Sequence, residues 1–273
     1  MDILSKIVIH KKKEVEGRKE LFPVKLLEKG IYFTTPTVSL KKCIVKDGKS
    51  GIIAEIKRKS PSKGDINPTV SVERTSIGYM QAGASALSVL TDSTFFGGSN
   101  EDLITAKKYN FCPILRKDFI IDEYQILEAK SIGADAILLI AAILEPGKLS
   151  GLATFARSLQ LEVLLEVHDE HELNSTIDSI PDVVGVNNRN LKSFEVDMGL
   201  SKRLVKLIPD GIVKISESGI DSPKTAASLR SLGFDGFLIG ETFMKTGRPE
   251  KAALEFIREL RKLEGKLKSD VSS

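Results

Sequence analysis

Eight short runs of apolar, β-forming residues recur along the 273-residue chain, and this repeat limits the possible folds more than any other feature. Successive runs begin about 25 residues apart, which is the length of one strand–loop–helix–loop unit. Strands that are apolar on both faces and are each followed by a helix belong to a parallel sheet covered on both sides. The runs occupy residues 51–58, 86–92, 112–119, 136–142, 162–167, 183–189, 213–219 and 236–242.

Between these runs, apolar residues return every three or four positions, as they do on the buried face of a helix. Three such segments end in glycine, at Gly83, Gly133 and Gly233, and glycine is a common helix terminator. Eight strand–helix units in one α/β domain predict a single (β/α)8 TIM barrel over residues 51–265, followed by a flexible tail at 266–273. An open doubly wound sheet is the alternative, but no glycine-rich nucleotide-binding motif follows the first strand.

Residues 1–50 lie outside the eight units and predict an N-terminal helical extension. Leu4, Ile7 and Val8 are spaced for an amphipathic helix, and a shorter helix is expected to begin at Pro23. The extension could plug the bottom of the barrel, cover its mouth or contact a second subunit.

The charge balance excludes functions that need a strongly basic or acidic surface. Lys and Arg number 40 against 37 Asp and Glu, a net charge of +3, so we expect neither nucleic acid nor a membrane surface as a partner. The basic run from His10 to Lys13 is predicted to form a solvated helix face. Cys43 and Cys112 are predicted to be reduced thiols, and no segment resembles a signal peptide or a membrane span. We therefore expect a cytoplasmic protein, either a monomer or a weak homo-oligomer.

The first strand carries two charges at its end, although burying an unpaired ion costs several kcal/mol or more. Glu55 and Lys57 are two residues apart in GIIAEIKR, so both point to the same side of the strand as Ile53. In a parallel barrel that side is the interior, and the carboxyl end of the strand is where barrel enzymes keep their chemistry.

Later strands repeat this arrangement of an apolar body and a polar end. Any one of these polar residues could be a solvated charge at the rim or part of a salt bridge that closes the barrel. Several of them at the same end of one barrel predict a functional site at its mouth. The residues are Lys117, Glu166, Asn187, Glu217 and Ser218.

Glycines at the ends of the last two strands indicate a phosphate site. Gly219 follows the seventh strand and Gly240 the eighth, and backbone N–H groups at such positions, including that of Glu241, can approach an anion. Ser60, after the first strand, adds a hydroxyl group.

In these segments the sequence resembles the indole-3-glycerol phosphate synthase family. The similarity covers nearly the whole chain from residue 51, and the extension before the barrel is also similar to that of the family. AEIKRKSPSKG together with LRKDF and NNRNL is a highly specific combination. The matching segments are AEIKRKSPSKG (54–64), VLTDSTFFGGS (89–99), LRKDFIIDEYQI (115–126), LLEVHDEHEL (164–173), GVNNRNLKSFEVD (185–197), KISESGI (214–220) and LIGETFM (238–244).

The resemblance implies a sugar-phosphate substrate, 1-(2-carboxyphenylamino)-1-deoxyribulose 5-phosphate, which closes to indole-3-glycerol phosphate with loss of CO2 and water. It implies that Lys117 is the general acid and Glu166 the general base. Lys57 would contact the substrate carboxylate, and which lysine serves which step stays open. Glu55 would orient both lysines. We expect Arg116 and Lys57 to depress the pKa of Lys117 towards a useful value.

The remaining positions follow from the same resemblance. Three polar residues correspond to groups that bind the substrate hydroxyls and the developing oxyanion, four to the phosphate cradle, and three to the apolar wall around the anthranilate ring. In that order they are Asn187, Glu217 and Ser218; Ser60, Gly219, Gly240 and Glu241; and Phe96, Phe119 and Leu191.

Three alternatives remain on sequence grounds. One is a Schiff-base aldolase with Lys117 as its nucleophile. Another is phosphoribosylanthranilate isomerase, which needs a cysteine/aspartate pair that Cys43 and Cys112 are badly placed to supply. The third is a barrel that only binds sugar phosphates. No metal or organic cofactor is expected, because the pair His168 and His171 lacks a third ligand and is predicted to be exposed.

Overall fold

The computed structural model describes residues 2–271, and its centre is a closed barrel of eight parallel strands. Each strand falls within one of the eight predicted runs, so the predicted (β/α)8 barrel is confirmed. Every strand pairs in parallel with two neighbours, and the ring closes between β1 and β4. The strands are β1 (Ile52–Ile56), β4 (Ala86–Leu90), β5 (Ile114–Lys117), β6 (Ala136–Ile140), β7 (Glu162–Val167), β8 (Val183–Asn187), β9 (Val213–Glu217) and β10 (Gly236–Ile239).

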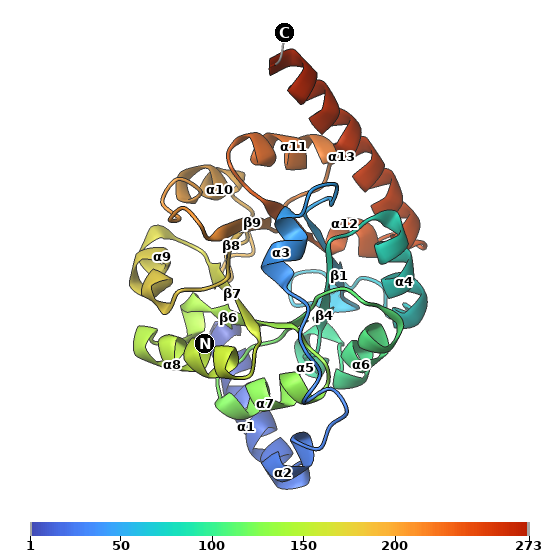
Figure 1. The fold of residues 1–273 in the computed structure, drawn as a ribbon. Coiled ribbons are helices and arrows are strands. Elements are labelled where there is room, and N and C mark those ends of the chain that lie inside the picture. The colour runs from blue at the N-terminus through green and yellow to red at the C-terminus, as the bar shows by residue number, and fades with distance from the viewer. Residues whose placement is uncertain (1, 272–273) are drawn as a thin grey trace.

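Helices surround the barrel on its outside (Figure 1). The last of them extends beyond residue 265, where the barrel domain was expected to end, and residues 272–273 of the expected tail lie outside the described part of the chain. The outer helices are α4 (Val72–Ala82), α6 (Asn100–Tyr109), α7 (Glu123–Ser131), α8 (Pro146–Ser158), α9 (Glu170–Thr176), α10 (Met198–Leu204), α11 (Pro223–Ser231) and α13 (Pro249–Val271).

Shorter elements fill the connections at the two ends of the barrel. The loop after β1 carries a two-stranded antiparallel hairpin, and a short helix follows each of β4 and β10. These elements are β2 (Lys59–Ser60), β3 (Gly64–Asp65), α5 (Ser93–Phe96), η1 (Ala141–Ile143), η2 (Ile177–Ser179) and α12 (Glu241–Met244).

Alternation along the strands divides the core into two parts. Ile53 and Leu164 belong to a buried cluster inside the barrel, whereas Ile52, Ala54 and Leu165 belong to the cluster between the strands and the helices. Because a strand turns successive side chains to opposite sides, the residues two positions after Ile53 and Leu164 also face inward. The barrel interior is therefore apolar towards the amino ends of the strands and charged at their carboxyl ends.

The N-terminal extension packs against both ends of the barrel. It contains α1 (Ile3–Leu21), α2 (Val24–Leu27) and α3 (Leu40–Val45). Leu40 and Ile44 of α3 join the interior cluster with Val183 and Val213, which begin their strands, so α3 plugs the bottom. Ile7 of α1 lines the cavity at the opposite end. In Figure 1 α3 lies in front of the barrel and α1 lies behind it.

The prediction that His10 to Lys13 form a solvated face is wrong for Lys11, which is completely buried. Its Nζ lies 2.9 Å from Asp92 Oδ2, 3.0 Å from Asp118 Oδ1 and 2.9 Å from Glu14 Oε2. The carboxylates outweigh the effect of burial, which by itself lowers the pKa of Lys11, and the net result is a raised pKa. This cluster fastens α1 to the ends of β4 and β5.

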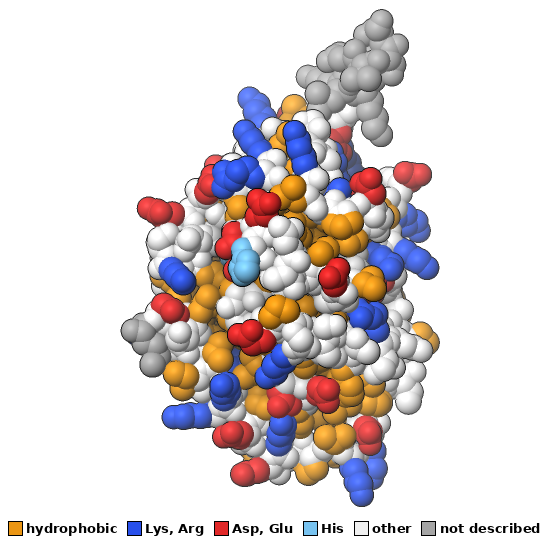
Figure 2. Space-filling view, turned by 90° about the vertical axis from the view of Figure 1, so that its left-hand side faces the viewer, with side chains coloured by type: hydrophobic (Ala, Val, Ile, Leu, Met, Phe, Trp, Pro, Cys, Tyr) orange, Lys and Arg blue, Asp and Glu red, His pale blue; other side chains and the backbone are white. Residues whose placement is uncertain are grey.

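The surface fits the mild net charge. In the view of Figure 2, which shows the side of α8, α9 and α10, acidic and basic side chains are interspersed. No helix in residues 2–271 is long and apolar enough to cross a membrane.

We predict that Lys11→Ala lowers the free energy of unfolding by about 3–5 kcal/mol, because it leaves Asp92 buried without its counter-charge and Asp118 with Arg116, 3.3 Å away, as its remaining cation. Urea denaturation of the wild type and the variant would measure the loss. Lys12→Ala is the matched control, since Lys12 is the exposed neighbour in the same run. A loss of less than about 1 kcal/mol for Lys11→Ala would show that the cluster does not hold α1 in place.

Candidate active site

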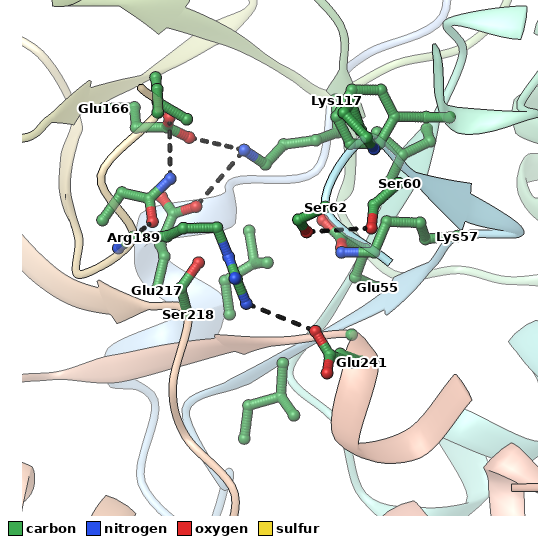
Figure 3. A pocket seen from close by; sticks show the side chains of 18 of the residues that line it. Glu55, Lys57, Ser60, Ser62, Lys117, Glu166, Arg189, Glu217, Ser218 and Glu241 are labelled. Carbon is green, nitrogen blue, oxygen red and sulfur yellow. Dashed lines mark hydrogen bonds and ion pairs between the residues drawn. The ribbon is translucent and has the colours of Figure 1, made fainter. Parts of the chain in front are cut away.

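One cavity lies at the carboxyl ends of the strands, and all the predicted site residues line it. Figure 3 shows charged side chains from β1, β5, β7 and β9 converging on this cavity. The charges at the strand ends are therefore neither scattered nor simply solvated, since Glu55, Glu166 and Glu217 are each no more than 3 % exposed.

Lys117 lies at the centre of this group. Its Nζ is 2.6 Å from Glu166 Oε2 and 3.4 Å from Glu217 Oε2. Burial by itself lowers the pKa of Lys117, but Glu166, Glu217 and Glu55 outweigh it, and the net pKa is raised. Lys117 is therefore a protonated, positively charged ammonium group at neutral pH.

The expectation that Arg116 and Lys57 depress the pKa of Lys117 is thus wrong. Arg116 is the preceding strand residue, so its side chain points to the outside of the barrel, where it donates to Gln125 O at 2.8 Å and Glu128 Oε2 at 2.6 Å. Lys57 is paired with Glu55, with Nζ 2.7 Å from Oε1. Both cations are already paired with carboxylates of their own. The carboxylates that face Lys117 therefore determine the direction of its pKa shift.

Glu166 is surrounded by donors on both carboxylate oxygens. Oε2 accepts from Lys117, and Oε1 accepts from Asn187 Nδ2 at 3.1 Å. Burial by itself raises the pKa of Glu166, but Lys117 and His168 outweigh it, so the net pKa is lowered and the side chain is a carboxylate.

Unlike Glu166, Glu217 has too little positive charge nearby to offset the effect of burial on its pKa. Burial and the carboxylates of Glu166 and Glu55 raise its pKa to about 7, with only partial opposition from Lys117. Its Oε1 is buried and accepts no hydrogen bond from any residue in the described part of the chain. Gly185 makes room for this carboxylate, since a Cβ atom there would lie 2.1 Å from Glu217 Oε1.

The apolar wall lies beside these charges. The rings of Phe96 and Phe119 have their centroids 5.9 Å apart, and Leu191 lines the same cavity. Ile3 and Ile7 of α1 complete this wall from the N-terminal extension. A flat apolar group next to a cluster of ionised groups is what the cavity can hold.

The part of the cavity opposite the apolar wall is lined by polar side chains and backbone groups. Ser218 and Gly219 both have positive φ, +63° and +73°, so the chain turns sharply after β9. Gly240 precedes α12, whose first N–H groups have no partner within the helix. Ser60 and Lys245 line the same region. The Glu241 carboxylate lies 3.4 Å from Arg189 Nη2, which balances its negative charge. The backbone N–H of Glu241 can therefore contact an anion although the side chain is acidic.

Besides lining residues such as Ile3, Ile7 and Lys245, the sequence reasoning missed two residues that interact with the predicted carboxylates. Arg189 lines the cavity and pairs with Glu241. His168 was predicted to be exposed, which is wrong: its side chain is only 10 % exposed, and Nε2 lies 3.3 Å from Glu166 Oε1. Both residues come two positions after an inward-facing residue, Asn187 or Glu166, so continued alternation was the available signal. His171, by contrast, is exposed.

Comparison with known proteins identifies the family of this chain. The family model for indole-3-glycerol phosphate synthase matches residues 4–259. The chain belongs to the indole-3-glycerol phosphate synthase family. It is 48 % identical over 259 residues to the indole-3-glycerol phosphate synthase of Bacteroides thetaiotaomicron, covering 95 % of this chain and 99 % of that protein. It is 45 % identical to the synthase of Caldanaerobacter subterraneus over 261 residues, covering 95 % of this chain and 99 % of that relative.

The family defines the reaction. An indole-3-glycerol phosphate synthase is a carboxy-lyase of tryptophan biosynthesis that acts on a sugar-phosphate derivative of anthranilate. A solved structure of thiamine phosphate pyrophosphorylase from Pyrococcus furiosus shares the fold with a TM-score of 0.60, at 14 % identity, covering 82 % of this chain and 99 % of that one. This second likeness concerns the barrel fold alone.

We predict that Glu217→Gln stabilises the protein at pH 8 and has little effect at pH 4. The pKa of Glu217 is raised to about 7, so between about pH 4 and 7 the unfolded chain loses this proton before the folded protein does. The resulting cost to stability is absent at pH 4 and complete at pH 8. Replacing the carboxylate should recover about 1–3 kcal/mol at pH 8.

Urea denaturation of the wild type and the variant at both pH values would measure this difference. Glu255→Gln, at an exposed position of α13, is the control and should change stability equally little at both. A destabilised Glu217→Gln at pH 8 would mean that the Lys117 charge needs Glu217 more than burial penalises it.

Proposed function

We propose that this cavity converts 1-(2-carboxyphenylamino)-1-deoxyribulose 5-phosphate to indole-3-glycerol phosphate with Lys117 as general acid and Glu166 as general base. The observation that carries this proposal is the contact of 2.6 Å between Lys117 Nζ and Glu166 Oε2 inside a buried site. A general acid must start protonated and a general base must start ionised. The pair holds each group in the charge state that its role requires.

Ring closure comes first and needs the acid. A weakly nucleophilic aromatic carbon attacks the ketone carbon, and negative charge develops on the ketone oxygen. Lys117 donates its proton to that oxygen, which becomes a hydroxyl group. Because the pKa of Lys117 is raised, the lysine keeps its proton until this strongly basic oxygen forms.

Loss of CO2 then restores the aromaticity of the ring. The substrate carboxylate must be held firmly enough for orientation but must still be able to leave. We assign it to Lys57, whose side chain is 17 % exposed and is neutralised by Glu55 at 2.7 Å. A cation that already has a partner attracts the departing carboxylate less strongly than an unpaired one.

Dehydration completes the indole. The hydroxyl group formed in ring closure leaves as water after protonation by Lys57, which still carries its proton, or by Lys117 once it has regained a proton from solvent. Glu166 removes the remaining proton that blocks the aromatic product. Asn187 supports Glu166 from its other oxygen at 3.1 Å. We also assign the hydroxyl groups of the substrate chain to Asn187, Glu217 and Ser218, which line the cavity.

The two ends of the substrate fit the two sides of the cavity. We assign the anthranilate ring to the wall of Phe96, Phe119 and Leu191. We assign the phosphate to Ser60 and the backbone at Gly219, Gly240 and Glu241, where the glycines leave room for close approach of an anion.

The charge state of Lys117 favours this function over a Schiff-base aldolase. A nucleophilic lysine has to be neutral, and a neighbourhood of three carboxylates opposes that state. The isomerase alternative places its chemistry on a cysteine, but Cys43 lies in α3 at the bottom of the barrel and Cys112 precedes β5. A barrel that only binds sugar phosphates has no need for the paired acid and base.

We also propose that the enzyme works in the cytoplasm, as a monomer or a weak homo-oligomer. The free thiols of Cys43 and Cys112 support a reducing compartment. The mixed charges on the face seen in Figure 2 support a solvated surface there.

Lys117→Met and Glu166→Gln should each lower kcat by about 10²–10⁴-fold, the usual contribution of general acid–base catalysis. The protein contains no tryptophan, so indole fluorescence on adding the substrate rises from a dark background. Lys224→Met, at an exposed position of α11, is the control and should keep the wild-type rate. A rate within about tenfold of wild type for Lys117→Met would refute the assignment of the acid. Borohydride trapping of a Lys117–substrate adduct would instead support the aldolase.

Gly219→Ala should raise KM by about tenfold or more and abolish competitive inhibition by inorganic phosphate. The Cβ atom would lie 2.5 Å from Val196 Cγ1, at a backbone φ of +73°, so the turn beneath the phosphate has to move. Gly147→Ala in α8 is the control, because no atom lies within 4 Å of the added Cβ. Steady-state kinetics with and without phosphate would test both. Unchanged phosphate inhibition in Gly219→Ala would place the phosphate elsewhere.

A further inference from the structure

A largely buried histidine lies directly behind the proposed general base and has no role in the reaction described above. His168 follows β7, two residues after Glu166, and its side chain is 10 % exposed. One ring nitrogen, Nε2, lies 3.3 Å from Glu166 Oε1, and the other, Nδ1, lies 3.1 Å from Glu172 Oε2. The imidazole therefore separates two carboxylates, one in the site and one in α9.

The orientation of the ring is fixed from the side away from the site. Glu172 Oε2 accepts a hydrogen bond from the backbone N–H of His168 at 2.7 Å as well as facing the ring. Glu172 is itself held in the first turn of α9, where its backbone N–H donates to the Asp169 side chain at 2.8 Å. With Nδ1 held by Glu172, Nε2 has to face Glu166.

The Nε2 atom is buried and makes no well-aligned hydrogen bond with any residue between 2 and 271. Its nearest opposite charge is Glu166 Oε1, at ion-pair distance. A buried ring nitrogen without a hydrogen bond costs free energy. Attraction between a positively charged ring and the Glu166 carboxylate offsets that cost. This points to an electrostatic role towards Glu166.

We propose that His168 is a positioning residue for Glu166: as an imidazolium held by Glu172, it keeps the Glu166 carboxylate ionised and fixed in orientation until Glu166 accepts the proton removed in dehydration. The proposal rests on the assignment of Glu166 as the general base. It adds a second cation behind the base, outside the cavity that receives the substrate.

A second cation is needed because Lys117 loses its positive charge during ring closure. When Lys117 gives its proton to the ketone oxygen, it becomes a neutral amine and stops stabilising the Glu166 carboxylate. His168 gives up no proton in that step, so its charge remains. The two cations also act on different oxygens, Lys117 on Oε2 and His168 on Oε1.

The charges around the two groups support this assignment. His168 faces the carboxylates of Glu166 and Glu172, which outweigh the effect of burial and raise its pKa to about 9. Glu166 faces Lys117 and His168 as cations and has Glu217 across Lys117 as a competing carboxylate. At pH 7 His168 is therefore positively charged.

Ring NMR of the three histidines tests the charge without turnover. The signal missing from His168→Gln identifies His168, which should titrate near pH 9 in the wild type. Glu172→Gln and Glu166→Gln should each lower this pKa by about one unit or more, since each removes a facing carboxylate. Titration of His168 near the ordinary value of about 6.5 in the wild type would overturn the proposal.

Kinetics test the consequence. His168→Gln keeps an N–H donor but loses the charge, so kcat should fall about tenfold with KM within about threefold, and the acid limb of the kcat profile should move up by about one pH unit. Glu172→Gln touches neither the site nor the substrate. It should match the wild type near pH 6 and lose activity towards pH 8, as His168 becomes neutral.

His171→Gln is the matched control, an exposed histidine in α9, and should leave rate and pH profile unchanged. Unshifted profiles in both His168→Gln and Glu172→Gln would overturn the proposal, and Glu172→Gln decides it if His168→Gln does not fold. A fully active Glu166→Gln would refute the base itself. The histidine titration would still report separately whether His168 and Glu166 are coupled.

Discussion

Closure of eight parallel strands is the constraint on which the rest of this protein depends. Each strand turns alternate side chains inward, and closure brings the carboxyl ends of all the strands to one rim. Residues far apart in sequence, such as Lys117 and Glu166, then come within 2.6 Å. An open sheet would spread the same residues along an edge, so both the acid–base pair and its burial result from closure.

The end of β5 links this site to the N-terminal extension through three consecutive residues. Arg116 points outward to Glu128, Lys117 points inward to Glu166, and Asp118 pairs with Lys11 of α1. The charge network that fastens α1 and the network that carries the chemistry are therefore adjacent in the chain. Because Ile7 of α1 also lines the cavity, the extension is part of the active site.

Residue spacing predicted which side chains meet but not the electrical balance among them. Alternation was enough to place Glu55 and Glu217 at the mouth, and the same rule, carried two residues further, would have found His168 and Arg189. The pKa of Lys117 could not be predicted in this way. Its direction depends on the fact that three carboxylates face the lysine whereas Arg116 and Lys57 already have partners.

The sequence by itself determined the closed barrel, the end at which the chemistry lies and the family of the enzyme, because strand period, glycine placement and motif order are local properties of the chain. Only the tertiary structure decided that Lys11 is buried while Lys12 is exposed, that α1 and α3 lie at opposite ends of the barrel, and that His168 lies against Glu166. These outcomes depend on distances between segments remote in sequence. Burial and Coulomb energies follow those distances and not the order of the residues.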